Sequence, residues 1–234
     1  MGPPVHALVQ DLDLFKGLPE REAEGVLAEA RLRKVAGGGS VFAQGAPALR
    51  FYMLVEGRLK IVQTSPEGQQ IIAHWVAPGQ FFGLAVALGR DDYPGTAVAV
   101  TDSTVLAWPV AAWEKLTSAH PAVAEAALRT IGGHLQDAFA RLREVTAARV
   151  EQRIARALLR LVRQSGRRTE LGVQIEFPIT RQDIAEMTST TLYTVSRTLS
   201  RTLSAWEQAG VLTGGRRRIV VLDPHALVRL AGEE

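Results

Sequence analysis

The residues whose types and spacing could do chemistry gather between positions 179 and 212. Thr180 can cap the start of a short helix, because Asp183 lies three residues further on, where its carboxylate can return to the backbone of the cap. A polar turn at 188–191 separates this helix from a second one that begins near Leu192. A helix, a short turn and a second helix form the arrangement that docks the second helix in the major groove of DNA.

The side chains expected on the outside of this helix pair are of kinds that bind nucleic acid. Arginine can pair with guanine through two hydrogen bonds, hydroxyl groups can hold phosphates, and Leu or Tyr can touch a thymine methyl group. A Gly-Gly-Arg-Arg-Arg run at 214–218 joins two β-rich segments and predicts a basic wing against the DNA backbone. The residues that we assign to DNA binding are Thr180, Arg181, Gln182, Thr191, Leu192, Tyr193, Thr194, Ser196, Arg197, Arg216, Arg217 and Arg218.

The charge of the chain is spread unevenly. The net charge is +3, but residues 1–148 carry −2 and residues 149–234 carry +5. Every basic residue of the second part is arginine, which binds phosphate and guanine edges with two parallel hydrogen bonds. A solvated basic surface would give the same counts, so charge suggests a face for nucleic acid without establishing one.

Composition and motifs exclude several other classes. The chain has no cysteine, which rules out disulfides, thiolate zinc sites and cysteine-ligated iron–sulfur clusters. No apolar run approaches the ~20 residues that span a bilayer, and the first 15 residues lack the pattern of a signal peptide. We therefore expect a cytoplasmic protein without a membrane partner. Enzyme motifs such as a metalloprotease helix, a phosphate-binding loop or a serine-hydrolase elbow are missing, and the five histidines are scattered, so we expect no enzyme.

Upstream of the helix pair the sequence changes texture twice. Residues 5–33 carry an apolar stripe at helical spacing. From 35 to 110, short β-rich runs alternate with glycines about every ten residues, which is typical of a small antiparallel barrel or sandwich. The expected strands are 40–42, 51–55, 58–63, 70–76, 96–100 and 104–108.

A long helix is expected from 121 to 147, with Pro121 in a first helical position. Its apolar residues repeat at spacings of four and three, as in a coiled-coil seam. Core packing inside one subunit would give a similar stripe. We favour a homodimer interface because the helix is long and polar on its other faces. The seam consists of Ala127, Ile131, Leu135, Ala138, Leu142 and Val145.

After the long helix, the pattern predicts a helix at 148–164, a basic loop at 166–168 and a short strand at 173–177. The fold class is α+β. We place a sensor domain at 1–118, a dimerisation helix at 119–148 and a winged helix-turn-helix at 149–234.

Three groups of segments resemble the CRP/FNR transcription regulators, and the resemblance covers nearly the whole chain. FAQG (42–45) and FYMLVEGRLKI (51–61) are similar to the opening of the family's β-roll, and PGQFFG (78–83) to the approach to its effector pocket. TRQDIA (180–185) with TVSR (194–197) is similar to its DNA-binding motif.

The resemblance implies an antiparallel β-roll of the cyclic-nucleotide-binding kind and a homodimer on an inverted-repeat operator in double-stranded DNA. It also implies an effector in the β-roll and RNA polymerase as a partner. Within the family, TLYTVSR (191–197) and YPGTA (93–97) look closest to the nitric-oxide-responsive NnrR/Dnr-type regulators of denitrification genes.

The effector pocket implied by the resemblance departs from that of the cyclic-AMP-binding members. Those members place a Glu directly after the pocket glycine and an Arg before a Ser or Thr, and here Leu84 and Gly95 stand at these positions. A buried cyclic phosphodiester would meet no cation, at a cost of several kcal/mol. We therefore expect an effector other than cyclic AMP. The pocket residues are Phe82, Gly83, Leu84, Gly95, Thr96 and Ala97.

A haem remains open as the carrier of the signal, because histidine is its natural ligand. The sensor half offers His6 and His74, although an ordinary surface or strand histidine would explain either residue. Apart from haem, the cofactor is unknown.

One feature departs from the family pattern near the DNA-binding motif. Arg-Thr-Leu-Ser at 197–200 is repeated at once at 201–204, whereas family members run from a single unit to the Ala-Trp-Glu equivalent. Four extra residues lengthen a helix by ~6 Å and rotate the downstream residues by ~40°. We expect the packing of Trp206 and the wing to shift. The alternative is a protein that binds a cyclic nucleotide or another small molecule and has impaired DNA binding.

Overall fold

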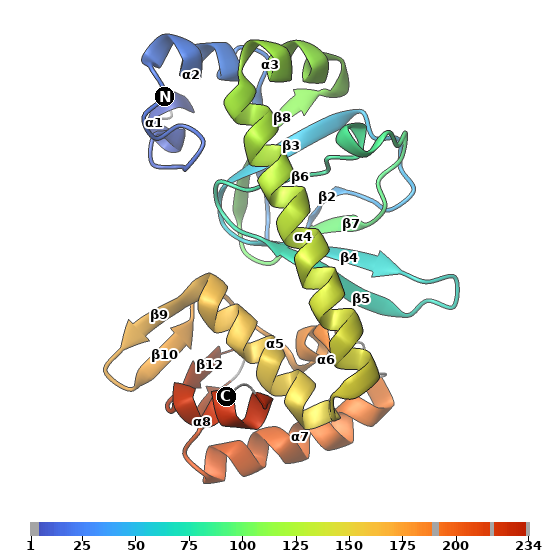
Figure 1. Cartoon of the computed structure of the whole chain (residues 1–234), viewed down its shortest axis with the longest axis vertical. Coiled ribbons are helices and arrows are strands. Elements are labelled where there is room, and N and C mark those ends of the chain that lie inside the picture. The colour runs from blue at the N-terminus through green and yellow to red at the C-terminus, as the bar shows by residue number, and fades with distance from the viewer. Residues whose placement is uncertain (1–4, 189–191, 216–217, 233–234) are drawn as a thin grey trace. The chain divides into compact units, whose positions relative to one another are not determined.

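The computed structural model describes residues 5–188, 192–215 and 218–232, and its elements form two compact units (Figure 1). The N-terminal unit comprises the chain up to Thr64 and Ala73–Gln136. The C-terminal unit comprises Ser65–Ile72 and the chain from Asp137 onward. Residues 65–72 therefore belong to the C-terminal unit, although the segments on both sides of them belong to the N-terminal unit.

Two short helices open the N-terminal unit, α1 (Val5–Val9) and α2 (Glu20–Leu27). The prediction of helix as far as residue 33 is wrong beyond Leu27, because Arg31–Val35 forms strand β1 and pairs with β8 (Ser103–Pro109). Four of its five residues are exposed and only Val35 is buried. The conformation of β1 is thus set by its partner strand and not by local periodicity.

Two four-stranded sheets form the β-roll, with strand orders β1-β8-β3-β6 and β2-β7-β4-β5. The six expected strands are confirmed to within two residues at each end, while the two-residue β6 was not predicted because it is too short to show alternation. Short 3-10 turns η1 and η2 lie at Val86–Leu88 and Val110–Ala112. The remaining strands are β2 (Ser40–Phe42), β3 (Arg50–Glu56), β4 (Leu59–Thr64), β5 (Gln70–Val76), β6 (Phe81–Phe82) and β7 (Thr96–Ala99).

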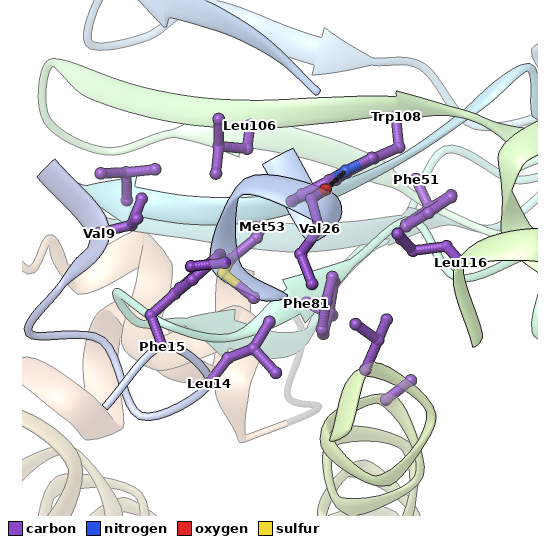
Figure 2. Packing of buried hydrophobic residues seen from close by; sticks show 14 of the residues in the cluster. Val9, Leu14, Phe15, Val26, Phe51, Met53, Phe81, Leu106, Trp108 and Leu116 are labelled. Carbon is purple, nitrogen blue, oxygen red and sulfur yellow. Dashed lines mark hydrogen bonds between the residues drawn. The ribbon is translucent and has the colours of Figure 1, made fainter. Parts of the chain in front are cut away.

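Strand β3 divides the interior of the N-terminal unit into two apolar clusters, because successive strand residues point to opposite faces. Phe51 packs in a cluster with the N-terminal helices, whereas Tyr52 packs in a second cluster within the β-roll. Figure 2 shows the first cluster, where Trp108 stacks on Phe51 with ring centroids 5.4 Å apart. The buried Trp108 Nε1 donates a hydrogen bond to the Val26 carbonyl at 2.8 Å, which satisfies its polar group.

Helix α3 (Trp113–Ala119) leads into α4 (Pro121–Ala147), whose bounds agree with the helix expected from the sequence. Val123 and Ala127 on α4 are buried in the first cluster. Midway along α4, Gly132 and Gly133 have no neighbouring atom within 4 Å of the position that a Cβ would take. These two glycines therefore face open space, although Ile131 and His134 on either side of them are packed.

The C-terminal unit combines helices with a sheet of strand order β11-β12-β10-β9. The expected basic loop at 166–168 is wrong, because these residues lie in edge strand β9 and pair with β10. Gly172, the first residue of β10, has φ +146°, and a Cβ there would lie 2.2 Å from the Val221 carbonyl oxygen, so this position requires glycine. The elements are α5 (Val150–Ser165), β9 (Gly166–Thr169), β10 (Gly172–Ile175), α6 (Arg181–Met187), α7 (Leu192–Gln208), β11 (Leu212–Gly215), β12 (Arg218–Val221) and α8 (Pro224–Ala231).

Candidate nucleic-acid interface and effector pocket

A capping box fixes the start of α6, as the sequence predicted. The Asp183 amide donates to Thr180 Oγ1 at 3.1 Å, and the Thr180 amide donates to Asp183 Oδ2 at 2.8 Å. The Thr180 hydroxyl also donates to the same carboxylate at 2.6 Å, and Asp183 is buried. The first helix of the pair is thus anchored by groups of its own sequence.

Helix α7 contains both copies of the Arg-Thr-Leu-Ser repeat in one continuous helix of 17 residues. Leu199, Leu203 and Trp206 are all buried, at spacings of four and three. The repeat therefore extends the apolar face of the helix, and Trp206 remains within the core of the C-terminal unit.

The side chains of some DNA-binding residues predicted from the sequence are described, and those of the others are not. Arg181 and Gln182 are the first two residues of α6. Arg181 Nη1 donates to Ser200 Oγ on α7 at 3.0 Å, and Gln182 Nε2 donates to Glu186 Oε1 at 2.7 Å. Thr191, Arg216 and Arg217 lie outside the described residues, and only the backbone is described for Leu192, Tyr193, Thr194, Ser196 and Arg197.

The wing is a two-stranded ribbon in which Gly215 pairs with Arg218 at the end of β11 and β12. Arg218 is exposed, and its Nη2 donates to Gln174 Oε1 on β10 at 2.7 Å. This hydrogen bond links the strand that leaves the wing to the neighbouring strand of the same sheet. The guanidinium remains exposed, and its planar set of N–H donors suits a phosphate contact.

The residues predicted for the effector pocket are divided between the two clusters of the N-terminal unit. Phe82 and Ala97 lie in the cluster within the β-roll, but Leu84 lies in the cluster with the N-terminal helices. Thr96 Oγ1 accepts a hydrogen bond from the Gln44 amide at 3.0 Å. A Cβ at Gly95 would come within 3.0 Å of the Val62 carbonyl oxygen, so backbone already approaches this position closely.

Aromatic side chains fill the β-roll beside Gly83, and of the four rings only Phe82 was predicted as a pocket residue from the sequence. Phe42 stacks on Tyr93 with ring centroids 3.8 Å apart, and Tyr52 stacks on Phe82 at 5.2 Å. Gly83 has φ +66°, and a Cβ there would lie 3.0 Å from Phe42 Cε1. The sequence did hold a signal for this aromatic group, because aromatic residues recur in or next to the predicted strands and the pocket glycine.

The hydroxyl of Tyr93 joins this aromatic group to the backbone of β3. Its hydroxyl donates to the Arg50 carbonyl at 2.7 Å and accepts from the Arg50 amide at 3.2 Å. Burial raises the pKa of the Tyr93 hydroxyl, and the neighbouring Tyr52 hydroxyl raises this pKa further. The ring is therefore held as a neutral phenol between backbone and aromatic walls.

The two candidate haem ligands lie in different surroundings. His6 lines a pocket of about 450 Å³ between α1 and α2, whose walls include the carboxylates Glu20 and Glu24. His74 on β5 stacks on His134 of α4, with ring centroids 3.6 Å apart. Neither place is an open apolar slot for a macrocycle, so a haem bound to either histidine would require neighbouring side chains to move.

The part of the chain that the structure describes contains no cluster of three or more His, Asp or Glu side chains able to hold a metal ion. Nor does any helix among those residues combine the length and hydropathy needed to cross a membrane.

Two family models match the chain, one in each half. Residues 32–120 match the cyclic nucleotide-binding domain, and residues 152–230 match the Crp-like helix-turn-helix domain. The matched segments contain the β-roll with the aromatic group, and the α6–α7 pair with its wing.

Among curated proteins, the chain is 28% identical to the cyclic AMP receptor protein of Thermus thermophilus, covering 93% of this chain and 96% of the relative. It is 27% identical to the global nitrogen regulator of Synechococcus elongatus, covering 81% and 85%. A solved CRP-family regulator from Thermus thermophilus superimposes with a TM-score of 0.71 at 27% identity, covering 86% of this chain and 96% of that one. These relatives are regulators of transcription, not enzymes. With both characteristic domains present in order, the chain belongs to the CRP/FNR family of DNA-binding transcription regulators.

Proposed function

We propose that the chain acts as a homodimer on an inverted-repeat operator and responds to a small molecule other than cyclic AMP. The observation that carries the dimer is an apolar stripe on α4. Five large apolar side chains of this one helix are between 46% and 68% exposed. They are Leu128, Leu135, Phe139, Leu142 and Val145.

A stripe of this size on a long helix needs a partner, because contiguous apolar surface is rarely left in water. The spacing of seven, four, three and three keeps these residues on one face of the helix. A second copy of α4 presents the same stripe, so pairing of the two helices in a two-fold symmetric interface buries both stripes at once.

This interface differs from the seam that the sequence suggested. Ala127 is buried in the N-terminal core, and the half-buried Ile131 packs against the same cluster. Both residues are therefore used inside one subunit. The proposed interface begins instead at Leu128 and passes through Phe139, which the seam did not include.

A homodimer of this kind would present two copies of α7, the helix that we propose to enter the major groove. Two recognition helices bind half-sites separated by about one turn of DNA, which is why the operator is expected to be an inverted repeat. RNA polymerase is the partner that we propose for a regulator bound there.

The proposed signal follows from the side chains beside Gly83. Leu84 packs in an apolar core, and backbone crowds Gly95, so neither position offers a polar anchor to a cyclic phosphodiester. The region is lined instead by aromatic rings, which favours an apolar or aromatic effector.

Nitric oxide sensed through haem, with His6 or His74 as the ligand, is a more specific version of this proposal, supported only by the likeness of 191–197 and 93–97 to that branch. An absorption spectrum of protein from haem-supplied cells tests it. A Soret band that disappears in His74→Ala or His6→Ala would support it, and protein without the band would count against it.

The dimer is tested by Phe139→Glu combined with Leu142→Glu, which puts four carboxylates into the interface. We expect sedimentation to show a dimer for the wild type and a monomer for the double variant at micromolar concentration. The double variant should also lose its preference for an inverted repeat over a single half-site in a gel shift. Leu49→Glu is a matched control, because Leu49 is 72% exposed and lies outside α4. A monomeric wild type, or a double variant that remains dimeric, would contradict the proposal.

A protein with impaired DNA binding is the competing possibility raised by the repeat in α7. Under either hypothesis the protein would bind an effector, but only a DNA-binding regulator would retard DNA in a gel. A gel shift at low salt with a generic inverted repeat separates them. The continuous α7 with buried Leu199 and Leu203 favours the regulator.

A further inference from the structure

The second copy of the repeat in α7 places an arginine at a position that was not assigned from the sequence. Arg201 follows position 197 by four residues in the same helix. Positions four apart lie one turn, ~6 Å, from each other and differ by only ~40° around the axis. Any face of α7 that carries position 197 toward DNA therefore carries position 201 as well.

Burial within the repeat shows which way Arg201 faces. Leu199 and Leu203 flank it at two residues on either side, and both are buried. Two helical residues correspond to ~200°, so position 201 lies opposite this apolar face. Arg201 is accordingly exposed, as is Ser204 one turn later.

A second guanidinium lies beside this place. Arg181, the first residue of α6, donates to Ser200 at 3.0 Å, and Ser200 directly precedes Arg201. The acidic groups of α6 make other contacts: Asp183 caps the helix, and Glu186 accepts from Gln182. The crossing of α6 over α7 therefore gathers two arginines and a hydroxyl group.

We propose that Arg201 binds a phosphate of the DNA backbone next to Arg181, so that the repeat adds a holding contact and not a base-reading one. Position 201 is the tenth residue of α7, about 13.5 Å from the start of the helix. Recognition helices read bases with their N-terminal residues, and the major groove is ~12 Å wide. Arg201 therefore lies at the border of the groove, where the phosphates are. This inference rests on the proposed role of α7 as the helix in the groove.

The test measures the affinity of the full-length protein for DNA as a function of salt. The probes are an inverted-repeat duplex selected with the wild type and an unrelated duplex of the same length. Neutralising one phosphate contributes a slope of about −0.9 in log affinity against log salt. The proposed homodimer carries two copies of Arg201, so we expect Arg201→Ala to lower the slope by about two units and to weaken binding to both duplexes about sixtyfold at 0.1 M salt. Arg201→Lys should keep the slope, because the point charge remains.

Two further variants make the outcome specific. Arg229→Ala on α8 removes the same charge from an exposed arginine of another helix and should leave the slope unchanged. Deletion of residues 201–204 places Leu199 three residues before the tryptophan, where Leu203 stands in the wild type, and should reduce the slope as Arg201→Ala does.

The proposal is overturned if Arg201→Ala keeps the wild-type slope, or if it relaxes the preference at one base pair in a selection on randomised half-sites. A deletion variant with the full slope would also overturn it. If the wild type binds neither duplex, the proposed function itself fails, which is distinguishable from failure of the Arg201 contact alone.

Discussion

Arg160 on α5 donates a hydrogen bond to Glu144 on α4 at 2.5 Å, and both side chains are largely buried. Arg141 lies nearby and donates to the Ile72 carbonyl at 3.2 Å. Burial lowers the pKa of Arg141, and the positive charge of Arg160 lowers this pKa further, whereas Asp137 and Glu144 oppose the shift. Glu144 is thus the carboxylate that balances two guanidinium groups where α4 meets α5.

Glu144→Ala should destabilise the C-terminal unit by about 3 kcal/mol, because removal of one partner leaves the other buried charge uncompensated. Replacing both residues, as Glu144→Leu with Arg160→Met, should restore most of this loss. Urea unfolding measures both effects when it is followed by the fluorescence of Trp206 in chains whose other three tryptophans are replaced by phenylalanine. A single variant as stable as the wild type would show that water already solvates Arg160.

Arg197→Ala should relax the preference at one base pair in each half-site, because a bidentate arginine–guanine pair gives ~1–3 kcal/mol of discrimination. Arg218→Ala, in the wing, should weaken binding to all sequences alike and lower the salt slope by about one unit for each subunit of the dimer. Selection on randomised half-sites and salt titrations distinguish the two. Should Arg197 only steady the helix, its variant would show a lower melting temperature and an unchanged sequence preference.

Cyclic AMP should not bind. A ligand at a hundred times its dissociation constant stabilises a folded protein by about 2.7 kcal/mol, which raises the melting temperature by several degrees. We expect no such rise with cyclic AMP at millimolar concentration, and no heat in calorimetry. The Thermus thermophilus cyclic AMP receptor protein is a suitable positive control. A micromolar dissociation constant would contradict this expectation.

Stability should fall at alkaline pH through Tyr93. Because burial raises the pKa of its hydroxyl, the folded chain retains that proton at a pH at which the unfolded chain, with a pKa of about 10, has lost it. This contribution is constant below about pH 10 and is lost as the pH rises above it. Tyr93→Phe should flatten the decline in urea midpoint above about pH 10. An equally steep decline in the variant would assign it to other groups.

Much of the fold could be predicted because its signals are local. Alternation between glycines located six strands of the β-roll, and Pro121 marked the start of α4. The Thr180–Asp183 pair marked the start of α6 because both hydrogen-bonding partners lie within four residues.

The errors arose where pairing overrides local pattern. Strand β1 and edge strand β9 are polar segments whose conformation depends on β8 and β10. Phe42, Tyr52 and Tyr93 were missed as neighbours of Gly83 because they come from segments far apart in the sequence. Ala127 was assigned to the dimer seam because periodicity alone does not tell which apolar face of a helix serves its own core.

The glycine pair in α4 determines where that helix yields first. Each glycine weakens a helix interior by about 0.5–1 kcal/mol relative to alanine, and no packed neighbour compensates at Gly132 or Gly133. The pair lies within one turn of Gln136, where the chain leaves the N-terminal unit. We therefore expect the thermal bending of α4 to concentrate at Gly132 and Gly133, near the middle of the helix. Amide protons around the pair should accordingly exchange with solvent faster than those around Ala127, which the N-terminal core clamps.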